Sequence, residues 1–259
     1  MIKILCIGDV VGKEGVSYLE SGGRLRRLIR ETGADYTIVN GENAAEGNGL
    51  SRDAANRLYD CGADLITGGN HTWKKREIYT MLDDEPWLIR PANYPAEAPG
   101  LGYVIADVGG VPVLVMNLLG TVFMDPLTPP IDAAERILEK EKGNYRLAVC
   151  DLHAEATSEK LCFARWFDGR ITAVFGTHTH VPTADAGILP GGTGYITDVG
   201  MCGSSAGILG VKTESVFHKF RVKTPCVFEP ATGDCHLNGV LFELDEAIGK
   251  CVRAERIDA

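Results

Sequence analysis

Short apolar, β-branched runs alternate with longer amphipathic segments over the first two thirds of the chain, and this alternation limits the possible folds more than any other feature. The runs predict strands at residues 2–7, 36–39, 64–67, 103–108, 111–117, 145–151 and 171–175. The segments between them predict helices at residues 14–31, 51–61, 74–83, 131–142 and 157–168, with Ser51 and Thr157 as N-cap residues. Strands joined through helices pair in parallel, so the sequence predicts an α/β fold with a mainly parallel sheet.

The pattern changes after Val181, where turn residues become frequent and few helical segments remain. Residues 195–199, 227–230 and 237–244 are typical of antiparallel strands. Residues 104–117, with a hairpin at Gly109 and Gly110, have the same character. We therefore expect a second, more antiparallel sheet. No linker or internal repeat divides the 259 residues, so a single domain over residues 1–259 is expected.

Composition excludes several classes of protein. The chain has 35 acidic and 26 basic residues, a formal charge of −9, which is the wrong sign for non-specific binding of nucleic acid. A small phosphorylated ligand remains possible if a metal supplies positive charge. Asp9 interrupts the first apolar run and no run approaches the ~20 residues that span a bilayer, so we expect a cytosolic protein. The eight cysteines form no CxxC pair, and free thiols are expected.

Potential metal ligands follow five of the predicted strands. In open α/β sheets ligands bind beyond the carboxyl ends of the strands, so these residues would converge on one cleft if the strands are neighbours. Carboxylate, amide and imidazole groups together suit Mn, Fe, Co, Ni or Zn, and such a set could share two metals. The residues are Asp9, Glu42, Asn43, Asn70, His71, His153, His178 and His180, which include four of the six histidines.

Taken one at a time, most of these residues have a structural interpretation. Asp9 could cap a helix or contact a dinucleotide, and any one histidine could be a structural group. Glu42, Asn43 and Asn70 could form turns. The whole set nevertheless favours a metal site, because otherwise each of the five independent strand ends would need a separate structural explanation.

The glycines at Gly8, Gly12 and Gly15 raise the alternative of a nucleotide-binding oxidoreductase. The spacing fits neither phosphate-binding fingerprint, because Gly12 lies four residues after Gly8 and Lys13 is followed by Glu14. HExxH and GxSxG are both absent, which counts against zincin proteases and acyl transfer.

The segments GDVV from Gly8, GEN from Gly41, GNHT from Gly69, LHAEATSEK from Leu152 and GTHTH from Gly176 resemble the motif series of calcineurin-like metallophosphoesterases. Three departures are similar to the YmdB branch of that superfamily. Val11 stands where the general pattern has a metal-binding histidine, Glu42 where it has the bridging aspartate, and Thr177 separates glycine from His-x-His. The branch is also suggested by GDVVGKEG, NGEN, GGNHTW, HAEATSEK, THTHVPTAD and ITDVGMCG, so the resemblance runs from residue 2 to about residue 205.

This resemblance implies a four-layer αββα sandwich, with two mixed sheets flanked by helices, and a centre of two divalent transition metals, Fe, Mn or Zn. Carried over by position, it implies a first metal on Asp9, Asn43 and His180, a second on Asn70, His153 and His178, and Glu42 as the bridge. Asn43 is available to fill the place that Val11 leaves without a histidine.

The resemblance also implies a metal-dependent phosphodiesterase for small phosphodiesters, with 2′,3′-cyclic nucleotides as substrates. A hydroxide between the metals would attack phosphorus, and His71 would act as general acid. One alternative is a broad phosphomonoesterase on the same site. Another is a regulatory or scaffolding protein with a metal site, although an unligated His71 argues against it. The family likeness also allows a homo-oligomer.

Overall fold

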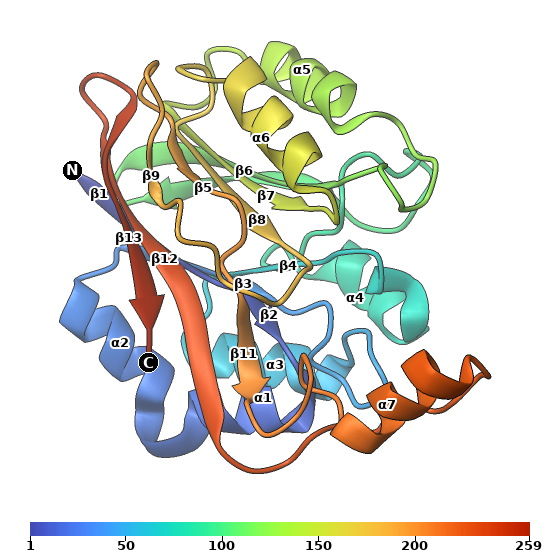
Figure 1. Ribbon diagram of the computed structural model, residues 1–259. Coiled ribbons are helices and arrows are strands. Elements are labelled where there is room, and N and C mark those ends of the chain that lie inside the picture. The colour runs from blue at the N-terminus through green and yellow to red at the C-terminus, as the bar shows by residue number, and fades with distance from the viewer.

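Two mixed β-sheets pack face to face in the computed structural model, which describes residues 1–259, and helices cover both outer faces (Figure 1). The first sheet has the order β2-β11-β12-β1-β3-β4, and β13 pairs with β12. Its strands are β1 (Ile2–Ile7), β2 (Asp9–Val10), β3 (Tyr36–Asn40), β4 (Leu65–Thr67), β11 (Met201–Ser204), β12 (Cys235–Asp245) and β13 (Lys250–Asp258).

The second sheet has the order β5-β6-β7-β8-β10-β9. Its strands are β5 (Tyr103–Val108), β6 (Val111–Leu119), β7 (Leu147–His153), β8 (Ala173–Thr177), β9 (Gly187–Ile188) and β10 (Gly194–Ile196). The helices are α1 (Gly12–Glu20), α2 (Arg24–Thr32), α3 (Arg52–Asp60), α4 (Ile78–Asp84), α5 (Pro130–Lys140), α6 (Thr157–Trp166) and α7 (Thr213–Val222), with short 3-10 turns at Ser21–Gly23 and Thr72–Lys74.

Three buried apolar layers hold the four structural layers together. Along β1, Ile4 and Cys6 face the second sheet, while Leu5 and Ile7 pack towards helices α1 to α4. Alternate residues of a strand point to opposite faces, so a strand buried on both faces is apolar throughout. Helices α5 and α6 pack on the outer face of the second sheet around residues such as Phe163. This arrangement confirms the expected αββα sandwich.

The parallel strands do not form one sheet as the β-α alternation predicts, and the C-terminal strands do not form a separate antiparallel sheet. β1, β3 and β4 are parallel neighbours in the first sheet, whereas β6, β7, β8 and β10 are parallel neighbours in the second. The C-terminal hairpin of β12 and β13 joins the first sheet antiparallel to β1. The predicted division of the strands into one mainly parallel sheet and one more antiparallel sheet was therefore wrong. Apolar runs show that strands are buried, but they do not specify which strands are neighbours.

Several local expectations also change. The helix predicted at residues 14–31 is broken at Gly22 and Gly23, whose φ angles of 61° and 65° no helix can continue through. Thr157 is inside helix α6, and Ala156 precedes it as N-cap residue. Ser51 is confirmed as an N-cap, because its hydroxyl accepts the Ala54 N–H at 3.1 Å. Residues 227–230 form no strand, and α7, β11 and β13 were not predicted.

The cysteines are all free, as composition predicts, and Cys162 is the one that is exposed. Among the helices, none combines the length and the apolar character that crossing a membrane requires.

Candidate metal centre

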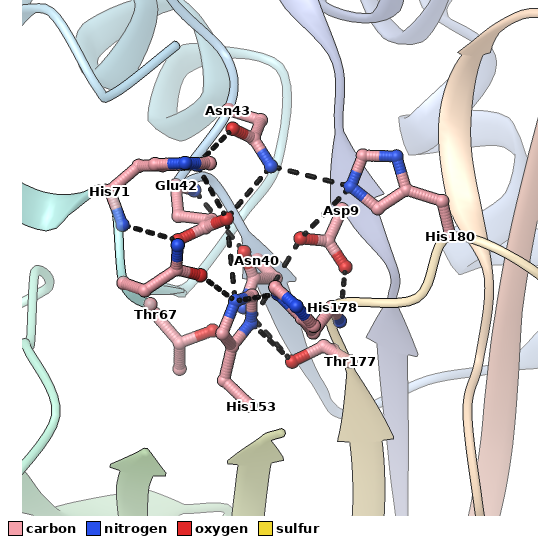
Figure 2. A network of polar contacts seen from close by, with 12 residues as sticks. Asp9, Asn40, Glu42, Asn43, Thr67, His71, His153, Thr177, His178 and His180 are labelled. Carbon is pink, nitrogen blue, oxygen red and sulfur yellow. Dashed lines mark hydrogen bonds and ion pairs between the residues drawn. The ribbon is translucent and has the colours of Figure 1, made fainter. Parts of the chain in front are cut away.

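The eight residues selected from the sequence lie together at one edge of the sandwich, where carboxyl ends of strands from both sheets meet (Figure 2). They lie at or just after the ends of β1, β3 and β4 in the first sheet and of β7 and β8 in the second, and Asp9 is the first residue of β2. The expected cleft at the edge of a single sheet is therefore a cleft between two sheets. The residues converge even though their strands are not all neighbours.

His153, the last residue of β7, is the centre of the first half of this cluster. Its Nε2 lies 3.0 Å from Asn70 Oδ1, 3.1 Å from His178 Nδ1 and 3.3 Å from Glu42 Oε1. Three potential ligand atoms, one from each of Glu42, His153 and His178, all lie within 4.8 Å of one another. Three potential ligand atoms thus lie close to His153 Nε2 in a buried part of the cluster, and carboxylate, amide and imidazole groups together suit a divalent transition metal.

Asp9, Asn43 and His180 form the second half. His180 Nε2 lies 3.7 Å from Asp9 Oδ1 and 3.3 Å from Asn43 Nδ2. Asp9 Oδ1 and His180 Nδ1 are buried and make no hydrogen bond. A buried carboxylate oxygen without a partner is costly in a folded protein, and a bound cation would satisfy it. The donor set and this orphaned oxygen fit a metal.

Asn43 has its amide turned so that Nδ2 donates to Glu42 Oε1 at 2.8 Å, while Oδ1 lies 2.8 Å from His71 Nδ1. An amide binds a cation through oxygen. Binding through Asn43 therefore requires a half-turn of the amide, which would replace its oxygen with nitrogen opposite His71.

Two buried carboxylates give the centre a negative field. Burial alone would lower the pKa of His153, but the charges of Glu42, Asp9 and Asp151 outweigh burial and raise this pKa to about 9. Burial would raise the pKa of Glu42, yet the contacts with His153 and His71 hold it well below its ordinary value. The centre therefore favours positive charge, which a proton on His153 or a cation can supply.

His71 is at the edge of the centre and contacts it through one side of its ring. Its backbone N–H donates to Glu42 Oε2 at 2.9 Å, and Nδ1 lies 3.2 Å from Glu42 Oε1. The side chain is 24% exposed and lines a cavity of about 460 Å³. Nδ1 is thus anchored, while Nε2 is free to meet a ligand in the cavity.

A network of polar residues below the centre orients His153, and sequence reasoning missed it. His153 Nδ1 lies 2.9 Å from Thr177 Oγ1, which donates to Asp151 Oδ1 at 2.7 Å. Because Thr177 gives its one proton to Asp151, it accepts from Nδ1–H of His153, so Nε2 faces the centre and its lone pair would be available to a cation that takes the place of the second proton. Asn40 and Thr67 of the first sheet bond to Asp151, so this network also joins the two sheets.

The backbone between His178 and His180 is held by a buried ion pair that was also missed. Lys160 Nζ lies 2.7 Å from Asp198 Oδ2, and both side chains are 1% exposed. Asp198 Oδ2 also accepts from the N–H and the hydroxyl of Thr179, at 3.1 and 2.8 Å. His178 and His180 have φ angles of 100° and 64°, which non-glycine residues rarely adopt. The ion pair therefore fixes the residue between two strained histidines.

Comparison with known proteins places the chain in a family. A model of the YmdB-like protein family matches residues 5–257. The 2′,3′-cyclic-nucleotide 2′-phosphodiesterase of Bacillus subtilis (strain 168) is 44% identical over 256 residues, which cover 99% of this chain and 96% of that protein. This chain belongs to the YmdB-like family. The match includes all five strand ends that form the centre.

Solved structures support the same relationship. A novel phosphatase from Mycoplasma pneumoniae is similar to this YmdB-like chain with a TM-score of 0.93 and 36% identity, over 100% of this chain and 93% of that one. A "Putative 5′-Nucleotidase" from Staphylococcus aureus matches with a TM-score of 0.60 and 15% identity, over 99% of this chain and 54% of the other. The second likeness concerns the fold alone.

Proposed function

We propose that this YmdB-like protein is a metal-dependent phosphodiesterase that hydrolyses small phosphodiesters, with 2′,3′-cyclic nucleotides as substrates. The observation that carries the proposal is the convergence of Glu42, His153 and His178 beside a cavity that His71 also lines. The activity named for the B. subtilis relative, at 44% identity, supports it.

Two divalent cations, Fe, Mn or Zn, would be held by the two halves of the cluster. Asp9, Asn43 and His180 would hold the first, Asn70, His153 and His178 the second, and Glu42 both. Cations bound there would supply positive charge for the phosphate oxygens and a hydroxide nucleophile near neutral pH. Glu42 lies within hydrogen-bond distance of both halves, through Asn43 on one side and His153 on the other, which supports the bridging role.

His71 would be the catalytic acid. Its ring is anchored at Nδ1 by Asn43 and Glu42, so a protonated Nε2 can face a substrate in the cavity without binding a metal. When the bond from phosphorus to the leaving oxygen breaks, Nε2–H would give its proton to that oxygen.

The test combines metal analysis with three substrates. We expect freshly purified protein to contain transition metal and to hydrolyse 2′,3′-cyclic AMP and bis-p-nitrophenyl phosphate, with loss of both activities on chelation and recovery with Mn²⁺. Hydrolysis of p-nitrophenyl phosphate as the better substrate would favour the phosphomonoesterase instead. A protein without metal and without turnover in any reconstitution would contradict the proposal and favour a binding role.

Thr177→Val should weaken metal binding by about 10–100-fold, the usual loss when an outer partner of a ligating histidine is removed. Valine keeps the shape of threonine but cannot accept the Nδ1–H of His153. The measurement is competition with a fluorescent chelator. Thr37→Val is the matched control, because Thr37 is buried in β3 and its hydroxyl has no partner. Equal affinities for the two variants would show that Thr177 does not orient His153.

A further inference from the structure

The loop between β6 and α5 presents an aromatic side chain at the cavity beside the centre. Phe123 is 89% exposed, and a single exposed apolar residue is ordinary on a protein surface. Its φ angle of 63° is not ordinary, because a bulky residue in the left-handed region is strained. Such strain persists only where surrounding contacts impose it, and it is common at ligand clamps.

The surrounding contacts are present on both sides of this loop. Glu159 of helix α6 accepts the N–H and the hydroxyl of Thr121 through Oε1, at 2.9 and 3.1 Å, and the N–H of Val122 through Oε2 at 3.2 Å. The buried Asn93 donates to the carbonyls of Leu119 and Thr128, at 2.7 and 3.0 Å, and so ties the two ends of the loop together. The exposed ring is therefore carried by an anchored segment.

Phe123 lines the same cavity as three residues of the centre. The space of about 460 Å³ is lined by Asn70, His71 and His178 together with Lys74, Phe123, Met124 and Asp125. This volume lies within the range of sites for small organic ligands. Apart from the imidazoles of the centre, Phe123 is the only aromatic side chain in the lining. A planar group attached to a phosphodiester at the centre would find its stacking surface there.

We propose that Phe123 is the stacking surface for the nucleobase of the substrate, an inference that rests on the function proposed above. An aromatic side chain stacks on every base, because each base has a π face. Phe123 therefore selects cyclic phosphodiesters that carry a base over those that do not, and it distinguishes little among the four bases. Lys74 and Asp125, which also line the cavity, provide polar groups for the part of the nucleotide between base and phosphate.

The test compares two cyclic phosphodiesters, 2′,3′-cyclic AMP and glycerol 1,2-cyclic phosphate, which has no base. Phe123→Ala in the metal-loaded enzyme should lower kcat/KM for cyclic AMP by about 5- to 150-fold, mainly through KM, because one stacking contact is lost. The same variant should leave kcat/KM for the glycerol compound unchanged. Phe123→Trp should retain the wild-type preference, whereas Phe123→Leu, apolar but without a π face, should lose it. Phe217→Ala is the matched control, since Phe217 is 61% exposed and does not line the cavity.

Two other results would overturn the inference. Equal losses on both substrates would mean that Phe123 supports the loop and does not bind a base, and no loss on either would mean that it has no role. If the wild-type enzyme hydrolysed neither compound, the proposed function would fail. Calorimetric titration with adenosine 3′-monophosphate would then still decide the role of Phe123, because weaker binding by Phe123→Ala supports base stacking and equal binding contradicts it.

Discussion

His71→Asn is expected to lower kcat for 2′,3′-cyclic AMP by about 10²–10⁴-fold, the usual contribution of a general acid, with no change in metal content. Asparagine is a suitable replacement because its amide can take the place of the imidazole Nδ1, either donating through Nδ2 to Asn43 Oδ1 or, after the half-turn of Asn43, accepting from Asn43 Nδ2 through Oδ1. The backbone N–H at position 71, which donates to Glu42 Oε2, is unaffected. The variant therefore removes Nε2 and keeps the contacts that hold the centre together.

The leaving group provides an internal control for this prediction. A p-nitrophenolate needs little help from an acid, whereas the alkoxide of a ribose needs a proton as its bond to phosphorus breaks. The loss for bis-p-nitrophenyl phosphate should therefore be smaller than the loss for cyclic AMP. Plasma mass spectrometry of the variant gives its metal content. Loss of metal together with activity would instead make His71 part of the metal-binding set.

The residues of the candidate centre could be selected from the sequence because each follows an apolar run. A polar residue directly after a buried strand stands out, as Asp9 does after β1 and His153 at the end of β7. Their convergence did not require knowledge of the sheets, since carboxyl ends from both sheets meet at one edge. The division of the strands between two sheets was not predictable, because it depends on pairing and not on hydrophobicity.

The residues that support the centre were missed for a different reason. Asp151 is within an apolar strand, and its partners Asn40 and Thr67 are 111 and 84 residues away in the sequence. A buried polar residue indicates that partners exist, but local patterns do not identify them. Helix α7 was missed because only Val216 is buried in it, so it has no apolar face turned to the core. The partners of Asp151 and the position of helix α7 both depend on contacts between distant parts of the chain, which a short segment of sequence does not contain.

Lys160→Met is expected to lower the free energy of unfolding by about 3–5 kcal/mol, the usual effect of removing one partner of a buried ion pair. Methionine retains an unbranched apolar stem, so the packing around position 160 changes little. Asp198 would keep its hydrogen bonds from Thr179 and from the Gly200 N–H, but its charge would be buried without a countercharge. Urea denaturation followed by circular dichroism measures the change, with an unaltered slope as the sign that the folded state is the same.

The double variant Lys160→Met/Asp198→Asn separates the charge from the other contacts of this pair. Because no unpaired charge remains, the double variant should be more stable than Lys160→Met alone. The effects of the two substitutions on the free energy of unfolding should therefore not add, as is usual for residues in contact. Lys212→Met is the matched surface control, since Lys212 and Glu229 form an exposed ion pair with side chains 47% and 59% accessible, and it should leave the urea midpoint unchanged. A double variant less stable than the single one would contradict the charge argument.

The same Lys160→Met protein, still folded without urea, should bind metal more weakly than wild type, because the ion pair holds Thr179 between the strained His178 and His180.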